Sequence, residues 1–203
     1  MPGCGASSFA EAKGAEMSLR ESEIVRYSRQ ILVREVGGRG QESLLAAVVE
    51  LGGGGAALST AAAYLAASGV SAIGAWQWRD PSEAGFYVGC SPDIVPDRAP
   101  GSSEVSFWIA EAPEEVPDGD RSRVIIGSAG GAARIVFGSP TTPVELLRAA
   151  APRDPVPAEV AELVGSLTAL VVQRLILGLG EPAGSLEVDR SGAIKVSGLQ
   201  ADR

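Results

Sequence analysis

The sequence predicts an α/β domain in which a mainly parallel sheet is flanked by helices and closed by a C-terminal β-hairpin. The main observation is a strand, a helix and a second strand in succession. Residues 46–51 and 70–78 are apolar runs of strand length, and residues 56–68 between them have the composition of a buried helix. Residues 46–78 are therefore expected to form one βαβ unit of about 30 residues.

The end of the chain supplies two further observations. Apolar residues recur at helical spacing over residues 157–177, and the glycines that follow are typical of a helix end. Short apolar runs at 186–188 and 193–196 flank the polar turn DRSG. This pattern predicts a closing hairpin.

The middle of the chain is expected to complete the sheet. Strands are predicted at 105–110, 124–126 and 134–137, and one or two helical turns at 143–150. The stretch 79–100 is rich in proline, glycine and acidic residues and is predicted to be a loop, and the glycines of 127–131 are predicted to break the chain between strands.

The N-terminal residues 1–17 are small, polar and aperiodic, so we expect a disordered leader, with either Met1 or Met17 as the true start. The remaining residues, 18–203, are within the usual size of one domain. A single domain is therefore predicted.

The first helix of that domain is predicted to begin at Ser18, which can form a capping box with Glu21, and to end near Gln30. Gly37, Gly38 and Gly40 are then expected to break the chain before a short amphipathic turn.

Composition excludes several classes of function. The net charge of −8, scattered along the chain, argues against binding to nucleic acid or to an anionic membrane. The chain has no histidine, and its two cysteines are far apart, so histidine-based catalysis and a structural zinc site are not expected. Without a signal-like N-terminus or a long apolar run, the predicted location is the cytoplasm.

The glycines after the first strand are the candidate cofactor site. Gly53 and Gly55 supply the first two glycines of a G-x-G-x-x-G loop, but Leu58 stands at the third place and would obstruct close packing of helix on strand. Glu50 lies near the end of the strand, where its charge would repel a phosphate. Gln77 stands where an acidic residue normally binds the ribose hydroxyls. The loop fits nucleotide binding and a purely structural turn equally.

Three stretches carry a resemblance to a known family: RYSRQILVREVGGRGQESL (26–44), LGGGGAALSTAAAYLAASGV (51–70), and GSLTALVVQRLILGLGEPAG (165–184) with the hairpin after it. In this order they resemble the Rossmann-like ThiF/MoeB/HesA family, whose members adenylate the C-terminal glycine of a ubiquitin-like or sulfur-carrier protein. The resemblance covers roughly half of the chain.

The resemblance implies a homodimer or a heterodimer that uses ATP with magnesium. It also implies that Arg29, the second arginine of RYSRQ, extends into the ATP site of the neighbouring subunit as a catalytic residue. A helix arginine paired with a nearby acidic side chain is the structural alternative for Arg29.

Several departures from the family pattern point to a shortened, degenerate member. The Asn-x-x-Arg-Gln stretch after the second strand is replaced by PSEAGFYVG, and the expected metal-binding aspartate has no match after the strand at 124–126. The paired CxxC zinc motifs are absent. The sequence therefore predicts a protein without metal ligands that has lost adenylation activity and acts as a scaffold or partner subunit. An active adenylyltransferase with an altered site is the alternative.

Overall fold

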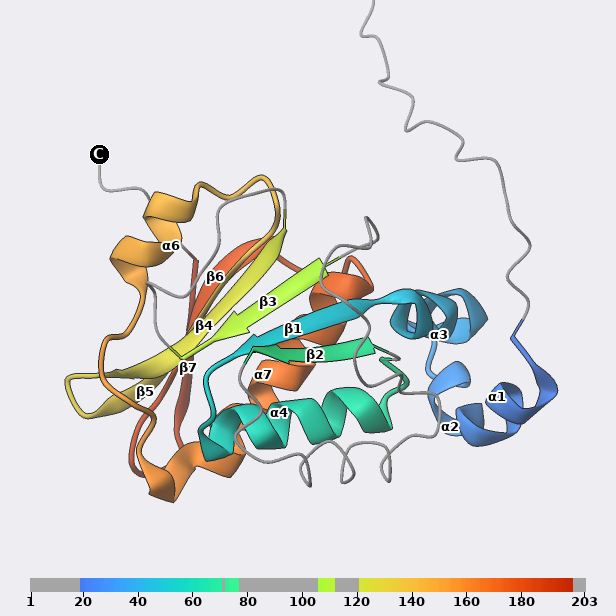
Figure 1. The fold of residues 1–203 in the computed structure, drawn as a ribbon, viewed down its shortest axis with the longest axis horizontal. Coiled ribbons are helices and arrows are strands. Elements are labelled where there is room, and N and C mark those ends of the chain that lie inside the picture. Colours follow the sequence, from blue (N-terminus) through green and yellow to red (C-terminus); the bar gives the residue numbers. More distant parts are fainter. Residues whose placement is uncertain (1–18, 71, 77–105, 112–120, 199–203) are drawn as a thin grey trace, which may run out of the picture.

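A computed structural model describes residues 19–70, 72–76, 106–111 and 121–198, with a single sheet at the centre (Figure 1). The strands are β1 Val48–Gly52, β2 Ala72–Trp76, β3 Ser106–Ala110, β4 Ser122–Ala129, β5 Ala132–Gly138, β6 Ala183–Val188 and β7 Ile194–Ser197. The helices are α1 Glu21–Arg26, α2 Ser28–Ile31, α3 Gly37–Ala46, α4 Ala56–Ala67, α6 Val144–Ala150 and α7 Ala161–Ile176, which follows a short 3-10 helix, η2 Ala158–Val160. The predicted leader and the predicted loop at 79–100 lie outside the described residues.

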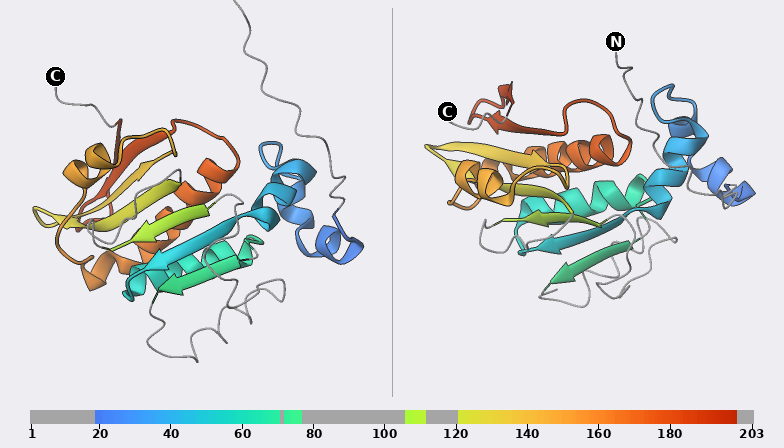
Figure 2. Two further views of the ribbon diagram at one scale, coloured as in Figure 1. Left: turned by 45° about the horizontal axis from the view of Figure 1, so that its top comes forward. Right: turned by 90° about the horizontal axis from the view of Figure 1, so that it is seen from above.

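The sheet has the order β2-β1-β3-β4-β5-β6-β7, and β2 and β7 lie at its opposite ends (Figure 2). The pairs β2–β1, β1–β3 and β3–β4 are parallel, whereas β4–β5, β5–β6 and β6–β7 are antiparallel. Tight turns join β4 to β5 and β6 to β7, and strands joined in this way can only pair antiparallel. The Rossmann-like class and the closing hairpin are confirmed, but the sheet is mixed rather than mainly parallel.

The predicted βαβ unit is confirmed as β1, α4 and β2. Every residue of β1 is buried, as expected for a strand with parallel neighbours on both sides. Gly69 follows α4 with φ of +98°, the left-handed conformation that commonly ends a helix. The unit brings the end of β1 directly to the start of α4.

Helices α4 and α7 cover one face of the sheet, and α6 covers the other (Figures 1 and 2). The two helices approach closely at Gly165 of α7. A Cβ atom there would lie 2.6 Å from the Cβ of Thr60 and closer still to the carbonyl oxygen of Ala57. On the opposite face, Leu147 of α6 is fully buried in a smaller apolar cluster with Trp108.

The expected break is wrong for Gly38 and Gly40, which lie within α3, whereas Gly37, the first residue of that helix, has the left-handed φ of +58° and does turn the chain. Tertiary packing overrides the low helix propensity of glycine here. A Cβ atom at Gly40 would lie 2.8 Å from Cδ2 of Leu177, so glycine permits the contact. Gln41, the next residue, is fully buried, and its side-chain amide donates a hydrogen bond to the carbonyl of Ser68 at 3.0 Å.

The first predicted helix is divided into α1 and α2 at Tyr27, whose side chain is 2% exposed. Its cap also differs from the prediction. Ser18 lies outside the described residues, and the carboxylate of Glu23 accepts the main-chain N–H of Arg20 at 2.7 Å. The helix therefore begins at Glu21, three residues after the predicted cap.

The predicted break at 127–131 begins too early, because β4 continues through Gly127 to Ala129. A Cβ atom at Gly127 would lie 2.7 Å from the carbonyl oxygen of Asp154, whose main chain pairs with Ser128. The glycine therefore admits a neighbouring segment rather than turning the chain. Only Gly130 and Gly131, with φ of +61° and +83°, form the turn.

Within the part of the chain that the structure describes, no helix combines the length and the apolar character needed to span a bilayer.

Candidate functional site

The glycine loop lies between the end of β1 and the N-terminus of α4. Gly53 has φ of +121°, which a side chain would strain, and Gly55 is the N-cap residue of α4. The sequence suggested that Leu58 would obstruct close packing of the helix on the strand, but in the structure it does not. It is 3% exposed and packs in the core, with Cδ1 at 2.8 Å from the position that a Cβ of Gly53 would take.

The main-chain N–H groups of this loop are bound by a side chain of the same molecule. Oε2 of Glu111 accepts hydrogen bonds from Gly55 N at 3.0 Å and from Gly54 N at 3.3 Å. Glu111 directly follows β3, and its own N–H donates to the carbonyl of Gly52 at 3.1 Å. The β1–β3 pairing therefore continues for one further bond and fixes the main chain of Glu111 beside the loop.

This carboxylate occupies the position at which such a loop would hold a phosphate. Free N–H groups and the positive end of the helix dipole favour an anion at the N-terminus of α4. The first turn of α4 contains no acidic residue of its own, so Glu111 supplies that negative charge. A bond from N–H to a carboxylate is stronger than one between neutral groups.

Glu50 takes no part in this cluster. It is 5% exposed, and its Oε2 accepts a hydrogen bond from Nη1 of Arg121 at 2.7 Å. The ion pair compensates the charge that the sequence suggested would repel a phosphate. The acidic residue that faces the loop is Glu111 instead.

The other predicted site residues are not brought to the loop. Gln77 lies outside the described residues. Arg29 lies on α2, beyond the start of β1, whereas the glycine loop follows the end of β1 (Figure 1). Arg29 is exposed, and within the described ranges it forms no ion pair, so the structural alternative of a nearby acidic partner is not seen there.

Sequence reasoning missed Glu111 because it followed chain order instead of strand order. The acidic residue was sought after the strand at 124–126, which lies in β4, but β3 is the strand that pairs with β1. Residues after adjacent parallel strands meet at the same edge of the sheet. The run FWIAE, an apolar strand ending directly in an acidic residue, was the available signal.

As arranged, the loop does not fit a triphosphate, because the carboxylate of Glu111 would have to leave the N–H groups first. Among the described residues no three potential metal-ligating side chains gather in one place. This geometry therefore supports no chemical step through ATP or magnesium.

Comparison with known proteins gives a partial match in sequence and a broad match in structure. Over 57 residues, 28% of this chain, the sequence is 49% identical to the adenylyltransferase and sulfurtransferase MOCS3 of Mus musculus, and the match spans only 12% of that protein. No family model matches the chain.

Among solved structures, Escherichia coli MccB in complex with AMPCPP and MccA has a TM-score of 0.63 at 14% identity, over 87% of this chain and 72% of MccB. PaaA has a TM-score of 0.64 at 12% identity, over 94% of this chain and 77% of PaaA. At such identities these structures show the fold alone.

The chain is therefore an α/β protein with the fold of the adenylating proteins of the ThiF/MoeB type. The resemblance to the ThiF/MoeB/HesA family that the sequence predicts is confirmed, in fold over most of the chain and in sequence over a short stretch.

Proposed function

We propose that this ThiF/MoeB-like protein has lost adenylation activity and acts in the cytoplasm as a dimer scaffold or partner subunit. Its partner would be an active adenylating enzyme, or a ubiquitin-like or sulfur-carrier protein. The observation that carries the proposal is the carboxylate of Glu111 on the N–H groups of Gly54 and Gly55.

The carboxylate of Glu111, bound to the loop N–H groups, opposes the binding of ATP in two ways. A phosphate must break the two hydrogen bonds that the loop already makes, and it must approach a fixed negative charge. Glu50 adds little to this repulsion, because its charge is compensated by Arg121. The sequence adds a further deficit, since Gln77 lacks the charge with which an acidic residue binds the ribose.

The partner role is supported by the surface of the N-terminal helices. Ile24 and Val25 of α1 are 48% and 72% exposed, and Leu32 and Val33 after α2 are 84% and 46% exposed. Exposed apolar residues that gather in one surface patch are typical of protein interfaces, and we propose that these four form such a patch. Arg29 lies among them on α2 with an exposed side chain, as an arginine directed at another subunit would.

The alternative is an active adenylyltransferase with an altered site, and one observation favours it. Glu111 follows a strand beside the glycine loop, and the family resemblance implies a metal-binding aspartate after a strand. Rotation of the Glu111 side chain away from the loop would free both N–H groups. The same residue would then be a candidate for binding a magnesium ion.

Thermal unfolding with Mg·ATP separates the two functions. A site with micromolar affinity, at millimolar nucleotide, would stabilise the protein by about 4 kcal/mol. We expect no shift in Tm and no ATP–pyrophosphate exchange in the presence of a carrier protein that ends in two glycines. Exchange above the rate of a carrier-free control would establish the alternative.

A further inference from the structure

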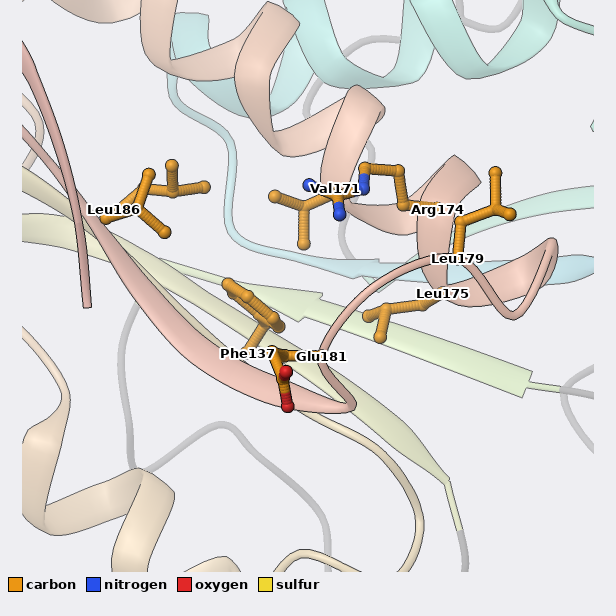
Figure 3. Close-up of a pocket in the computed structure, with 8 residues that line it drawn as sticks. Phe137, Val171, Arg174, Leu175, Leu179, Glu181 and Leu186 are labelled. Atoms are coloured by element: carbon orange, nitrogen blue, oxygen red, sulfur yellow. The ribbon is translucent and has the colours of Figure 1, made fainter. Parts of the chain in front are cut away.

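A pocket of about 120 Å³ lies between α7 and the antiparallel strands (Figure 3). Three strands and the end of α7 supply its apolar lining, which consists of Phe137, Leu186, Val196, Val171, Leu175 and Leu179. Among the described residues that line it, none belongs to the glycine loop, and Glu111 is not one of them. The pocket is therefore a separate site, and what it binds does not depend on the proposed function.

The loop from α7 to β6, which forms one wall of this pocket, is held at both ends. The N–H of Leu179 donates a hydrogen bond to the carbonyl of Arg174 at 2.8 Å, and the N–H of Ser139 donates to the carbonyl of Pro182 at 2.8 Å. These bonds fix the main chain on either side of Glu181. A wall that is ordered before a ligand arrives lowers the entropy cost of binding.

Two opposite charges lie at one rim of the pocket. Arg174 and Glu181 are the charged residues in its lining, and both are exposed. A Cβ atom at Gly180 would meet the guanidinium of Arg174, so this cation lies against the main chain directly before Glu181. Within the described ranges neither side chain forms an ion pair or a hydrogen bond, and the two charged groups lie apart in Figure 3. The rim therefore presents a cation and an anion that are near each other but not paired.

These charges favour a ligand that is itself a zwitterion. The lining has no net charge, so a simple anion or a simple cation would meet a like charge as well as an opposite one. A carboxylate bound to Arg174 and an ammonium group bound to Glu181 would match both. Because the two residues share one rim, the two charged groups of the ligand must also be close together. The α-carbon of a free amino acid carries them in this way.

The size and lining of the pocket select the side chain of that amino acid. A cavity of roughly 150 Å³ lined by leucine, isoleucine and phenylalanine is known to accept benzene. The pocket here, at about 120 Å³, is smaller and has an apolar lining below the rim. It therefore suits an aliphatic side chain better than a polar one or a large aromatic one.

We propose that this pocket binds a free aliphatic amino acid of the size of valine or leucine. The ligand carboxylate accepts hydrogen bonds from the guanidinium of Arg174, and the ligand ammonium group donates to the carboxylate of Glu181. The aliphatic side chain packs against Phe137, Val171 and Leu175. The same residue within a peptide would lose one or both charges to amide bonds, so the site selects the free amino acid.

Titration of the full chain with L-leucine tests the proposal, followed through the methyl resonances of Val171, Leu175 and Leu179. We expect a Kd of about 1 mM, because small ligands bind weakly, and a rise in Tm of roughly 3–6 °C at ten times the Kd. Three analogues each lack one part of leucine: 4-methylpentanoate has no ammonium group, 3-methylbutylamine has no carboxylate, and glycine has no side chain. The first two should bind about fivefold more weakly than leucine, and glycine should not bind measurably.

Two variants assign the charges of the ligand to the two rim residues. Arg174→Gln should weaken leucine binding about fivefold, the effect of one exposed charge pair, without weakening the binding of 3-methylbutylamine. Glu181→Gln should weaken leucine binding to the same extent without weakening the binding of 4-methylpentanoate. Arg34→Gln and Glu145→Gln, which remove exposed charges outside the pocket, are the matched controls and should change neither. The Tm of each variant without ligand shows that it folds.

Several results would overturn the proposal. The first is the absence of saturable leucine binding at concentrations well above the millimolar range. The second is equal affinity for leucine and for the two analogues that lack a charge, because the rim residues would then take no part. The third is a set of resonance changes that spares the pocket methyl groups. None of these results concerns the glycine loop, so the proposed function would be unaffected by them.

Discussion

Replacing Glu111 with alanine should free the glycine loop and cost stability at the same time. The two bonds from Gly54 and Gly55, at 3.3 and 3.0 Å, resemble a helix N-cap, whose loss costs about 0.5–2 kcal/mol, and the helix dipole adds roughly 0.3–1 kcal/mol. We therefore expect Glu111→Ala to lower the free energy of unfolding by about 1–2 kcal/mol. For a domain of this size, Tm should fall by roughly 2–8 °C.

The same substitution should create an anion site. The wild-type protein must break bonds worth about 1–2 kcal/mol before a phosphate can bind, and each 1.4 kcal/mol corresponds to a factor of about ten in affinity. Glu111→Ala should bind inorganic pyrophosphate about 5- to 30-fold more tightly than the wild type. Glu111→Gln should lie between them, because its amide can still accept one N–H without the charge.

Calorimetric titration with pyrophosphate, together with thermal unfolding, measures both effects. Glu145→Ala is the matched control, because Glu145 is an exposed acidic residue of α6 away from the loop. If Glu111→Ala and Glu145→Ala have the same Tm and the same pyrophosphate affinity, the carboxylate of Glu111 is not bound to the N–H groups of the loop. That result would refute the assignment of Glu111 to the anion position.

Three further predictions concern other parts of the molecule. Arg29→Ala should lower the activity of a co-expressed active paralogue about 10²-fold or more if it completes that enzyme's site, as measured by pyrophosphate exchange, and unchanged activity would exclude the role. Gly165→Ala should lower the free energy of unfolding by about 1–3 kcal/mol in urea, because the added Cβ would lie 2.6 Å from that of Thr60; no loss would mean that α4 and α7 are not so close. The pKa of Asp189 in the β6–β7 turn is held below its ordinary value, chiefly by the hydroxyl of Ser191. Protection of the hairpin amides from exchange should therefore be complete above the pKa of the unfolded chain and fall as pH drops through the folded value, whereas Asp189→Asn should lose this dependence.

Local patterns predicted those elements whose structure depends on neighbours in sequence. The alternation of apolar runs and glycines over 46–78 indicated β1, α4 and β2, and the turn DRSG indicated the final hairpin. Tertiary contacts decided the remainder. Gly40 stays helical because Leu177, distant in sequence, packs against it. No local pattern could have indicated that contact.

The candidate site was predicted only in part for the same reason. Gly53 and Gly55 follow a strand and open a helix, so they could be read from a short stretch of sequence. Glu111 lies 56 residues beyond Gly55, and it reaches the loop only because β3 crosses to pair with β1. The order of the strands in the sheet determines which acidic residue faces the glycines, and local sequence patterns do not reveal that order.

The central claim is that the glycine loop is filled by the protein's own carboxylate and does not accept a nucleotide. Titration of the wild-type chain with Mg·ATP, followed through the amide resonances of Gly54 and Gly55, tests it most directly. The claim predicts that both resonances stay in place up to millimolar nucleotide. Saturable movement of both, at a concentration expected for specific binding, would contradict it.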